Sequence, residues 1–460
     1  MHGHKLGRGV DSRTLSVLGE QTFAADLAAI KSLDDRRERK KVVDRAHRLA
    51  AELFGAKQSF FLVNGSFLSV QAALLAIAGP DEEVLVGRNV HRSVAAGLIL
   101  GGQRPVFMAP DFDDERAIAH PVTSETMRAA LDAHPAAKGV MVVSPSYYGV
   151  SADLAGQARA CHEHAIPFAV DDAWGVHFGF HPDLPESPIA AGADLSIGSV
   201  HKTVGGLAPA SILSVQGDLV DVEALQQRID LLETTSPSVP VLASIDGWRR
   251  AMALDGEATM TRVLELARRA RKEIGEIDGL TVMGEEVLDR PGACGLDETK
   301  IVVDVSALPV TGFTAWDYLD REHHVLLELE DHRRLVAIVT PADDDATIDR
   351  LVAALRSCAR WAEGQPVEPV DLPRPSELQT ELAMTPRQAF FADTVQVPLS
   401  NAVGLIAAEM ASPYPPGVPI VLPGERITQA IVDYLGEVVR ATALIPDARD
   451  PELKQILVVR

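Results

Sequence analysis

The chain carries F-A-V-D-D-A-W-G at residues 168–175 and L-S-I-G-S-V-H-K-T at residues 195–203. In each stretch a short apolar run is followed by polar side chains, which include Asp171 in the first and Lys202, 31 residues further on, in the second. Short apolar runs of this kind are typical of the buried strands of a parallel sheet. Because the carboxyl ends of parallel strands meet at one edge of a sheet, the pattern predicts a carboxylate and an amine close together at that edge.

The same pattern repeats along the chain from about residue 58 to residue 215. Apolar, strand-like runs alternate there with stretches of helical patterning. This alternation predicts an α/β fold with a mainly parallel seven-stranded sheet, covered by helices on both faces. The strand-like runs are 60–63, 84–86, 106–108, 140–143, 168–170, 195–197 and 212–215, and the helical stretches are 69–78, 93–100, 124–133 and 152–164.

Changes in pattern along the chain predict four segments. Two strand-like runs, 301–305 and 335–339, indicate a second, smaller α/β unit, and the proline-rich acidic stretch 365–375 is typical of a linker. Helical stretches flank the sheet at 36–54, 219–232 and 241–277. The predicted segments are an N-terminal segment (1–57), a large domain (58–280), a small α/β domain (281–365) and a C-terminal α+β domain (366–460).

Composition argues against several classes of protein. The 460 residues are 47% hydrophobic and 23% charged, an ordinary globular composition with material for two or three packed units. A net charge of −22 argues against a nucleic-acid partner and is compatible with attraction of a cationic substrate or with solubility alone. No apolar run approaches the roughly 20 residues that cross a bilayer, and the start lacks a signal-peptide core, so no membrane partner is expected. The few, widely spaced cysteines, Cys161, Cys294 and Cys358, favour a reducing cytoplasm.

Asp171 and Lys202 form the pair that a pyridoxal phosphate (PLP) enzyme needs. The lysine amine forms a Schiff base with the cofactor aldehyde, and the carboxylate keeps the pyridine nitrogen protonated so that the ring accepts electrons. A carboxylate at the edge of an apolar strand requires a cation or a donor, and an arginine or lysine partner would also satisfy Asp171. For Lys202 the alternative is an ordinary surface lysine, which its neighbours Ser199, His201 and Thr203 make less favoured.

Further side chains at the same predicted edge suit a phosphate group. Asn64-Gly65-Ser66 follows a strand and opens a helix, where backbone N–H groups and a hydroxyl can bind phosphate. The alternative for this tripeptide is an ordinary helix cap. Ser199 and His201 add two more phosphate-type groups beside Lys202.

Two other residues suit the flat ring of such a cofactor. His91 follows the second strand, where an imidazole can stack on an aromatic ring or simply begin a helix. Ala173 is small enough for a ring to lie against the backbone. His177 and His181 have a spacing that binds metal on a helix, but their stretch contains glycine and phenylalanine, so no metal site is expected.

Taken together, these motifs resemble the PLP-dependent ornithine/lysine/arginine decarboxylases of the aspartate-aminotransferase-like fold. The resemblance extends over nearly the whole chain, and its most specific part is the tail. There P-R-Q-A-F (386–390), A-E (408–409), P-Y-P-P-G-V-P (413–419) and P-G-E (423–425) follow in an order that general aminotransferases do not share. The other matching blocks are G-H-K (3–5), F-F-L-V-N-G-S (60–66), R-N-V-H-R-S (88–93), D-D-A-W-G-V-H-F-G-F (171–180), S-V-H-K-T (199–203) and T-T-S-P-S (234–238).

The resemblance implies a role for each candidate residue. Lys202 is then the Schiff-base lysine, Asp171 the partner of the pyridinium nitrogen and His91 the ring-stacking residue. The chain departs from the family pattern in several places. Phe67 replaces a hydroxyl residue after N-G-S, Asp172 replaces the usual glutamate and Trp174 the usual histidine. After the lysine, L-A-P-A (207–210) stands where the family commonly has L-T-Q-x. The implied phosphate and cofactor contacts are Ser66, Ser199, His201, Gly65 and Ala173, and the candidate substrate contacts are Trp174, Glu328 and Glu425.

The implied activity is α-decarboxylation of a basic L-amino acid (arginine, lysine or ornithine), in cytoplasmic amino-acid metabolism or polyamine biosynthesis. One alternative is another PLP reaction, transamination or elimination, in which Arg333 or Arg334 would bind the α-carboxylate. A second alternative is a non-catalytic relative that regulates a true decarboxylase. The resemblance also implies a short form without an N-terminal wing domain, assembled as a homodimer or dimer of dimers with active sites at the subunit interface. A cationic side chain requires an acidic partner, for which the candidates are Glu328, Glu330, Asp331 and Glu425.

Overall fold

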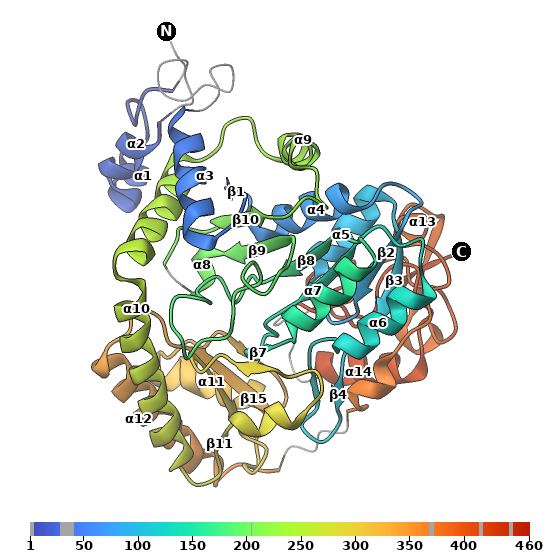
Figure 1. Ribbon diagram of the computed structural model, residues 1–460. Coiled ribbons are helices and arrows are strands. Elements are labelled where there is room, and N and C mark those ends of the chain that lie inside the picture. The colour runs from blue at the N-terminus through green and yellow to red at the C-terminus, as the bar shows by residue number, and fades with distance from the viewer. Residues whose placement is uncertain (1–3, 28–40, 204, 368–371, 414–416, 441–444) are drawn as a thin grey trace.

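A seven-stranded sheet forms the centre of the large unit in the computed structural model, which describes residues 4–27, 41–203, 205–367, 372–413, 417–440 and 445–460 (Figure 1). The strand order is β1-β10-β9-β8-β6-β2-β3. Every neighbouring pair from β9 to β3 is parallel, whereas β10 pairs antiparallel with both β9 and β1. The predicted mainly parallel, seven-stranded sheet is therefore confirmed. The strands are β1 (Gln58–Leu62), β2 (Glu83–Gly87), β3 (Arg104–Met108), β6 (Val140–Val143), β8 (Phe168–Asp171), β9 (Leu195–Ser199) and β10 (Ser211–Val215).

Helices cover both faces of this sheet because its strands are apolar on both sides. Val84 and Val86 of β2 lie in a core shared with α4, α5 and α9, whereas Leu85 between them packs in the core beneath α6 and α7. Successive side chains of a strand point to opposite faces, so a continuous apolar run requires cover on both. The covering helices are α4 (Gly65–Ile77), α5 (Arg92–Gly101), α6 (Ser124–Ala133), α7 (Leu154–Glu163) and α9 (Val222–Leu232).

A smaller α/β unit follows the long helix α10 (Val239–Gly275). Its sheet has the order β11-β13-β15-β14 with antiparallel pairing throughout, and α10, α11 and α12 pack against it. The short strand β12 pairs with β7 of the large unit, so backbone hydrogen bonds join the two units. Its elements are β11 (Thr281–Val282), η2 (Glu285–Asp289), β12 (Gly295–Leu296), β13 (Lys300–Asp304), α11 (Gly312–His323), β14 (Leu329–Glu330), β15 (Arg334–Ile338) and α12 (Asp345–Ala362), and β7 is Val150–Ser151.

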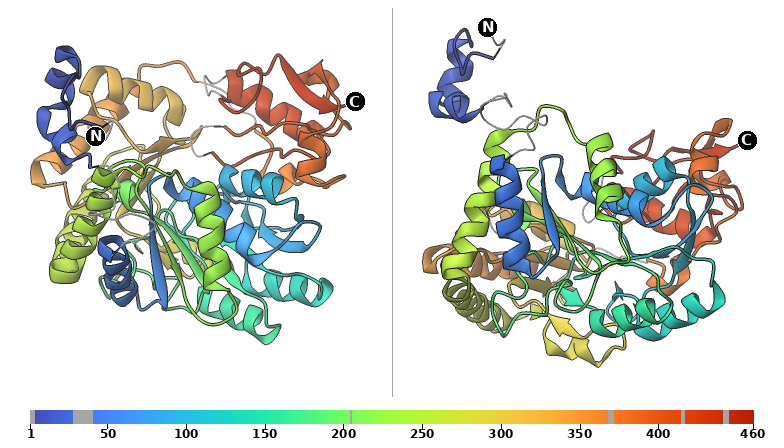
Figure 2. Two further views of the ribbon diagram at one scale, coloured as in Figure 1. Left: turned by 90° about the horizontal axis from the view of Figure 1, so that it is seen from above. Right: turned by 45° about the horizontal axis from the view of Figure 1, so that its top comes forward.

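The C-terminal unit has its own apolar core and a two-stranded sheet of β16 and β17. Figure 2 shows it beside α5 and on the opposite side of the molecule from α1 and α2. The Arg387 guanidinium fixes this contact by donating to the carbonyl oxygen of Ile99 at 2.8 Å. Residues 368–371 of the predicted linker lie outside the described residues. The elements are η3 (Pro375–Leu378), α13 (Pro386–Phe390), β16 (Thr394–Pro398), η4 (Leu399–Asn401), α14 (Gln429–Arg440) and β17 (Gln455–Val459).

The predicted amphipathic helix ahead of the sheet is present as α3 (Lys41–Phe54), which packs on β1 and α10. Residues 36–40 of that prediction lie outside the described residues. Across the described ranges, no helix combines the length and apolar character needed to span a bilayer. The remaining elements are α1 (Ser12–Leu18), α2 (Glu20–Ala25), β4 (Phe112–Asp113), β5 (Ile118–Ala119) and α8 (Val200–Thr203).

Candidate active site

Asp171 and Lys202 meet at the carboxyl edge of the sheet. Asp171 is the last residue of β8, and Lys202 lies in the short helix α8, directly after the neighbouring parallel strand β9. The Asp171 side chain is buried and accepts a hydrogen bond from the Ala173 backbone N–H at 3.2 Å. Burial raises the pKa of Asp171 to about 6, against the opposing influence of the Lys202 charge. No salt bridge to Asp171 is present among the described residues. Because a buried carboxylate is costly unless it is paired, this site suits the binding of a cationic group.

The Lys202 amine lies against an aromatic ring, and charged groups of both signs act on it. Its Nζ is 4.2 Å from the centroid of the Trp174 ring, a cation–π distance. Burial is the main cause that lowers the pKa of Lys202, and Lys300 adds to the lowering. Asp171 and Glu328 oppose it. An amine with a lowered pKa is the more nucleophilic form of lysine at neutral pH.

A cluster of buried serine hydroxyls lies beside Lys202 at the start of α4. Ser66 Oγ is 2.7 Å from Ser199 Oγ and 3.0 Å from Ser211 Oγ, and Ser69 Oγ is 2.9 Å from Ser211 Oγ. Gly65 has φ +74°, and a Cβ there would lie 3.2 Å from the Pro209 side chain. Hydroxyls gathered at the N-terminus of a thirteen-residue helix form a suitable cradle for an anionic group.

His91 and Phe67 lie together at the start of α5. His91 is the N-cap residue, and its Nδ1 accepts from the Ser93 backbone N–H at 3.2 Å. Burial, together with the charges of Lys202 and Arg92, lowers the pKa of His91 to about 3, so the imidazole is neutral at physiological pH. The Phe67 ring lies edge-on to the imidazole, with centroids 6.3 Å apart, and is 39% exposed. A flat neutral imidazole in this position suits ring stacking.

The remaining candidate cofactor contacts have defined positions. His201 Nδ1 lies 2.9 Å from the Ala210 carbonyl oxygen, which requires the proton to be on Nδ1. Ala173 and Trp174 are both buried in the turn after β8. His177 and Asp297 lie 3.2 Å apart in a fully buried contact.

The candidate substrate contact Glu425 has a different environment from the one expected. Its carboxylate is buried and forms a bidentate pair with Arg88, with both N–O distances 2.8 Å. One of its oxygens also accepts from the Leu422 backbone N–H at 2.7 Å. Both oxygens therefore hold the C-terminal unit against the loop after β2, and we assign Glu425 to that contact.

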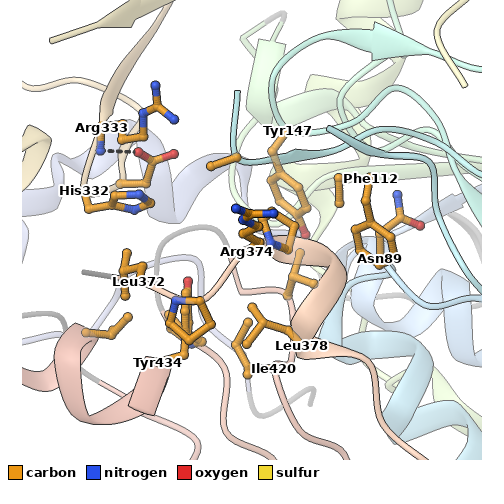
Figure 3. A pocket seen from close by; sticks show the side chains of 18 of the residues that line it. Asn89, Phe112, Tyr147, His332, Arg333, Leu372, Arg374, Leu378, Ile420 and Tyr434 are labelled. Carbon is orange, nitrogen blue, oxygen red and sulfur yellow. Dashed lines mark hydrogen bonds between the residues drawn. The ribbon is translucent and has the colours of Figure 1, made fainter. Parts of the chain in front are cut away.

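A cavity of about 600 Å³ lies where the large, small and C-terminal units meet (Figure 3). Its lining combines apolar and aromatic side chains such as Phe112 and Tyr147 with the guanidinium groups of Arg333 and Arg374. None of the three catalytic candidates is among its described lining residues. Tyr147, in the cavity wall, nevertheless contacts Trp174, with ring centroids 6.3 Å apart. The Trp174 ring in turn contacts the Lys202 amine, so one side chain separates the cavity wall from that amine.

Sequence reasoning missed Ser211, Asp297 and Lys300. Ser211 faces Ser199 across the β9–β10 pairing, a neighbourhood that only the register of two antiparallel strands creates. Lys300 is 1% exposed, although a lysine at the start of a strand normally indicates the surface. Asp297 and Lys300 are only three residues apart, but their contacts with His177 and with the Trp174 carbonyl oxygen depend on how the small unit packs against the large one, which no local signal in the sequence marks.

Comparison with known proteins gives the family. The chain matches the model of the Orn/Lys/Arg decarboxylase major domain over residues 1–295 and that of the C-terminal domain over residues 375–447. The chain belongs to the Orn/Lys/Arg decarboxylase family. This match confirms the resemblance found in the motifs. The family is one of decarboxylases, so the chain is an enzyme of that class.

Two curated relatives align over essentially the whole chain. The arginine decarboxylase of Bacillus subtilis is 37% identical and is covered over 94% of its length, with 100% of this chain aligned. The arginine decarboxylase of Halalkalibacterium halodurans is 38% identical and is covered over 93% of its length, again with 100% of this chain. Among solved structures, the constitutive lysine decarboxylase of Escherichia coli has a TM-score of 0.78 at 19% identity, over 100% of this chain and 79% of that one. That structural match supports the fold.

Proposed function

We propose that this protein is a PLP-dependent L-arginine decarboxylase that releases CO2 and agmatine. The observation that carries the proposal is the meeting of Asp171, Lys202 and the Ser66–Ser199–Ser211 hydroxyls at one sheet edge. Family membership supplies the reaction class, decarboxylation of a basic amino acid. The named relatives at 37% and 38% identity favour arginine within that class.

The residues present fit PLP. The buried Asp171 carboxylate, which has no salt bridge to any described residue, suits the pyridinium nitrogen, and the hydroxyls of Ser66, Ser199 and Ser211 suit the phosphate. Bound PLP supplies an electron-accepting ring that stabilises the charge left when the carboxylate departs. The other proposed contacts are Lys202 at the aldehyde carbon, His91 and Ala173 on the ring faces, and Gly65 and His201 near the phosphate.

The protein residues prepare the reaction in three ways. The Asp171 carboxylate would stabilise the positive charge of the pyridinium nitrogen, and it does so in a buried site from which water is excluded. Neutral His91 gives the ring a flat surface without adding a repelling charge. Lys202 Nζ is the group that we propose holds and returns the proton at Cα, because the His201 proton is on Nδ1 and is donated to Ala210.

Glu328 is the proposed acidic partner of the substrate's basic side chain. Asp331 accepts from Tyr148 at 2.7 Å and from Arg334 at 2.9 Å, and Glu425 is held by Arg88. The Glu328 carboxylate is exposed, and the charges of Lys202 and Lys300 act on it. Among the described residues neither Glu328 nor Glu330 has a salt bridge, and we choose Glu328 because the charge of Lys202 acts on it, whereas the charges that act on Glu330 are those of Asp317 and Asp331.

A transaminase would use an arginine of the small unit to bind the α-carboxylate. Both candidates are engaged: Arg334 is buried against Asp331, and Arg333 donates to Ser306 and to the Glu115 carbonyl oxygen. This arrangement supports decarboxylation over transamination.

The proposal is tested by product analysis of purified protein loaded with PLP. Arginine, lysine and ornithine are supplied separately, and CO2 and amine are quantified without any keto acid. We expect agmatine from arginine as the main product. Glu328→Gln should raise KM for arginine about tenfold or more with a smaller change in kcat, since uniform binding to a charged side chain is lost. The control Glu330→Gln, two residues away, should leave KM nearly unchanged; equal effects of both variants, or a keto-acid requirement, would contradict the proposal.

We further propose a cytoplasmic homodimer, or a dimer of such dimers, with the active site at the subunit interface and a role in polyamine supply. Apolar side chains near the site are exposed in the single chain, including Phe67 at 39% and Leu207 at 51%. A second copy covering them would bury apolar area at the rim of the site. Analytical ultracentrifugation should show no stable monomer at micromolar concentration; a monomer with full activity would contradict this part.

A further inference from the structure

The Trp174 ring lies within cation–π distance of two lysine amines. Lys202 Nζ is 4.2 Å from the centroid of its ring, and Lys300 Nζ is 5.6 Å from the same centroid. The indole is buried, and a buried indole in contact with an ammonium group stabilises the charge through its electron-rich face. The Trp174 ring thus contacts the Lys202 amine and is positioned to fix where that amine lies.

A buried polar cluster holds the turn that carries Trp174. Lys300 Nζ donates to the Trp174 carbonyl oxygen at 3.0 Å and pairs with Asp297 Oδ2 at 2.9 Å. The same carboxylate lies 3.2 Å from His177 Nε2, and its other oxygen accepts from Thr299 Oγ1 at 2.6 Å. Lys300, Asp297 and His177 are each 2% exposed or less. Such a cluster requires good geometry, because each buried charge depends on its partners.

The surrounding backbone leaves little freedom for this cluster to shift. The Asp297 backbone N–H donates to the Gly149 carbonyl oxygen at 2.9 Å. A Cβ at Gly149 would lie 3.3 Å from the Lys300 side chain, and one at Gly175 would lie 2.8 Å from Pro145. The small unit contacts the turn after β8 at two residues, through Lys300 at Trp174 and through Asp297 at His177.

We propose that Trp174, held by the Lys300–Asp297–His177 cluster, is a positioning residue that fixes the Lys202 amine and stabilises its protonated form through the indole face. The inference rests on the proposed role of Lys202 in the active site. It assigns a function to two buried residues of the small unit, Asp297 and Lys300. The small unit thereby contributes to the properties of a lysine in the large unit.

The charged groups that face Lys202 fix the sign of the expected change. Asp171 and Glu328 favour the ammonium form, Lys300 opposes it, and His91 is neutral. Removing the indole while keeping an apolar side chain deletes the cation–π contribution and leaves these charges in place. The apparent pKa of Lys202 should then fall. Loosening of the packing with water entry would have the opposite effect, since it would relieve the burial that lowers the pKa.

The test uses the full-length protein with any cofactor removed by hydroxylamine and dialysis. Acetylation of Lys202 by acetic anhydride is followed against pH by mass spectrometry of the peptide that carries residue 202. Trp174→Leu should lower the midpoint pH of labelling by about half to one and a half pH units, about a three- to thirty-fold change in the protonation equilibrium. Trp174→Phe retains an aromatic face and should recover at least half of that shift. An unchanged or raised midpoint in Trp174→Leu overturns the proposal.

The role of the cluster is tested with the double variant Lys300→Met/Asp297→Asn, which removes both charges and leaves no unpaired buried ion. Removing the Lys300 charge by itself favours the ammonium form of Lys202, so the informative comparison is the effect of Trp174→Leu with and without the cluster. If the cluster acts through Trp174, adding Trp174→Leu to the double variant causes little further change. Fully additive shifts would show that the cluster does not act through Trp174. Because the labelling needs no cofactor, its outcome is separate from that of any activity assay, and a failed decarboxylation assay leaves this result standing.

Discussion

Replacing Asp171 by asparagine should stabilise the cofactor-free protein. Burial raises the pKa of this carboxyl from 3.8 to about 6, so the folded chain favours the neutral acid more than the unfolded chain does. The ionised form therefore destabilises the fold as the pH rises past about 4, and the full penalty is present above about pH 7. Asparagine is neutral at every pH and can accept the same hydrogen bond from Ala173.

The magnitude follows from the difference between the two pKa values. About two pH units correspond to about 3 kcal/mol of unfolding free energy at pH 8, and to almost nothing at pH 4. For a chain of 460 residues, an unfolding entropy of about 2.1 cal/mol/K per residue converts this into a rise in Tm of about 3 °C. Affinity for PLP should fall at the same time, because the pyridinium nitrogen loses its ionised partner.

The assay is calorimetric melting of cofactor-free protein at several pH values and matched concentration. Asp194→Asn is the control, because Asp194 is also buried, at the opposite edge of the same sheet, but is partnered by His162 at 2.9 Å and by the Phe168 backbone N–H at 2.9 Å. The control should lower Tm. The reasoning is refuted if Asp171→Asn destabilises the protein at pH 8, or if its effect does not vary between pH 4 and pH 8.

Two further outcomes follow from the structure. Glu425→Gln leaves the partly buried Arg88 without a counter-charge, so the unfolding free energy should fall by about 3 kcal/mol and proteolysis of the C-terminal unit should accelerate. The exposed pair of Glu381 with Arg426 provides the control. Glu381→Gln should change the unfolding free energy by less than about 1 kcal/mol. His91, whose pKa is lowered to about 3, should show a constant imidazole NMR shift between pH 5 and pH 8, and a titration near pH 6.5 would contradict its buried, neutral state.

The large unit was predictable from sequence because its strands are apolar on both faces and leave a continuous signal. The runs at 140–143 and 168–170 are found almost residue for residue in β6 and β8. Asp171 is the last residue of β8, and Lys202 lies in α8, directly after β9. The candidate site could be predicted because its polar residues stand at the carboxyl ends of these apolar strands. Motif resemblance then supplied the family, which the comparisons confirmed.

Residues whose roles depend on distant partners were not predictable. Glu425 appeared as a substrate contact from its place in a motif, but Arg88, 337 residues away, takes its carboxylate. Lys300 was not singled out from the sequence, because nothing near it along the chain indicates that its amine would donate to the carbonyl oxygen of Trp174, 126 residues away. Periodicity reports burial along one element, whereas ion pairs between units depend on how those units pack.

The central claim is that Lys202 carries the cofactor, and borohydride reduction of PLP-loaded protein followed by peptide mapping tests it most directly. The account predicts a single stable label on Lys202, lost in Lys202→Ala. A label on the neighbouring buried Lys300, or an unlabelled Lys202 in protein saturated with PLP, would contradict the account.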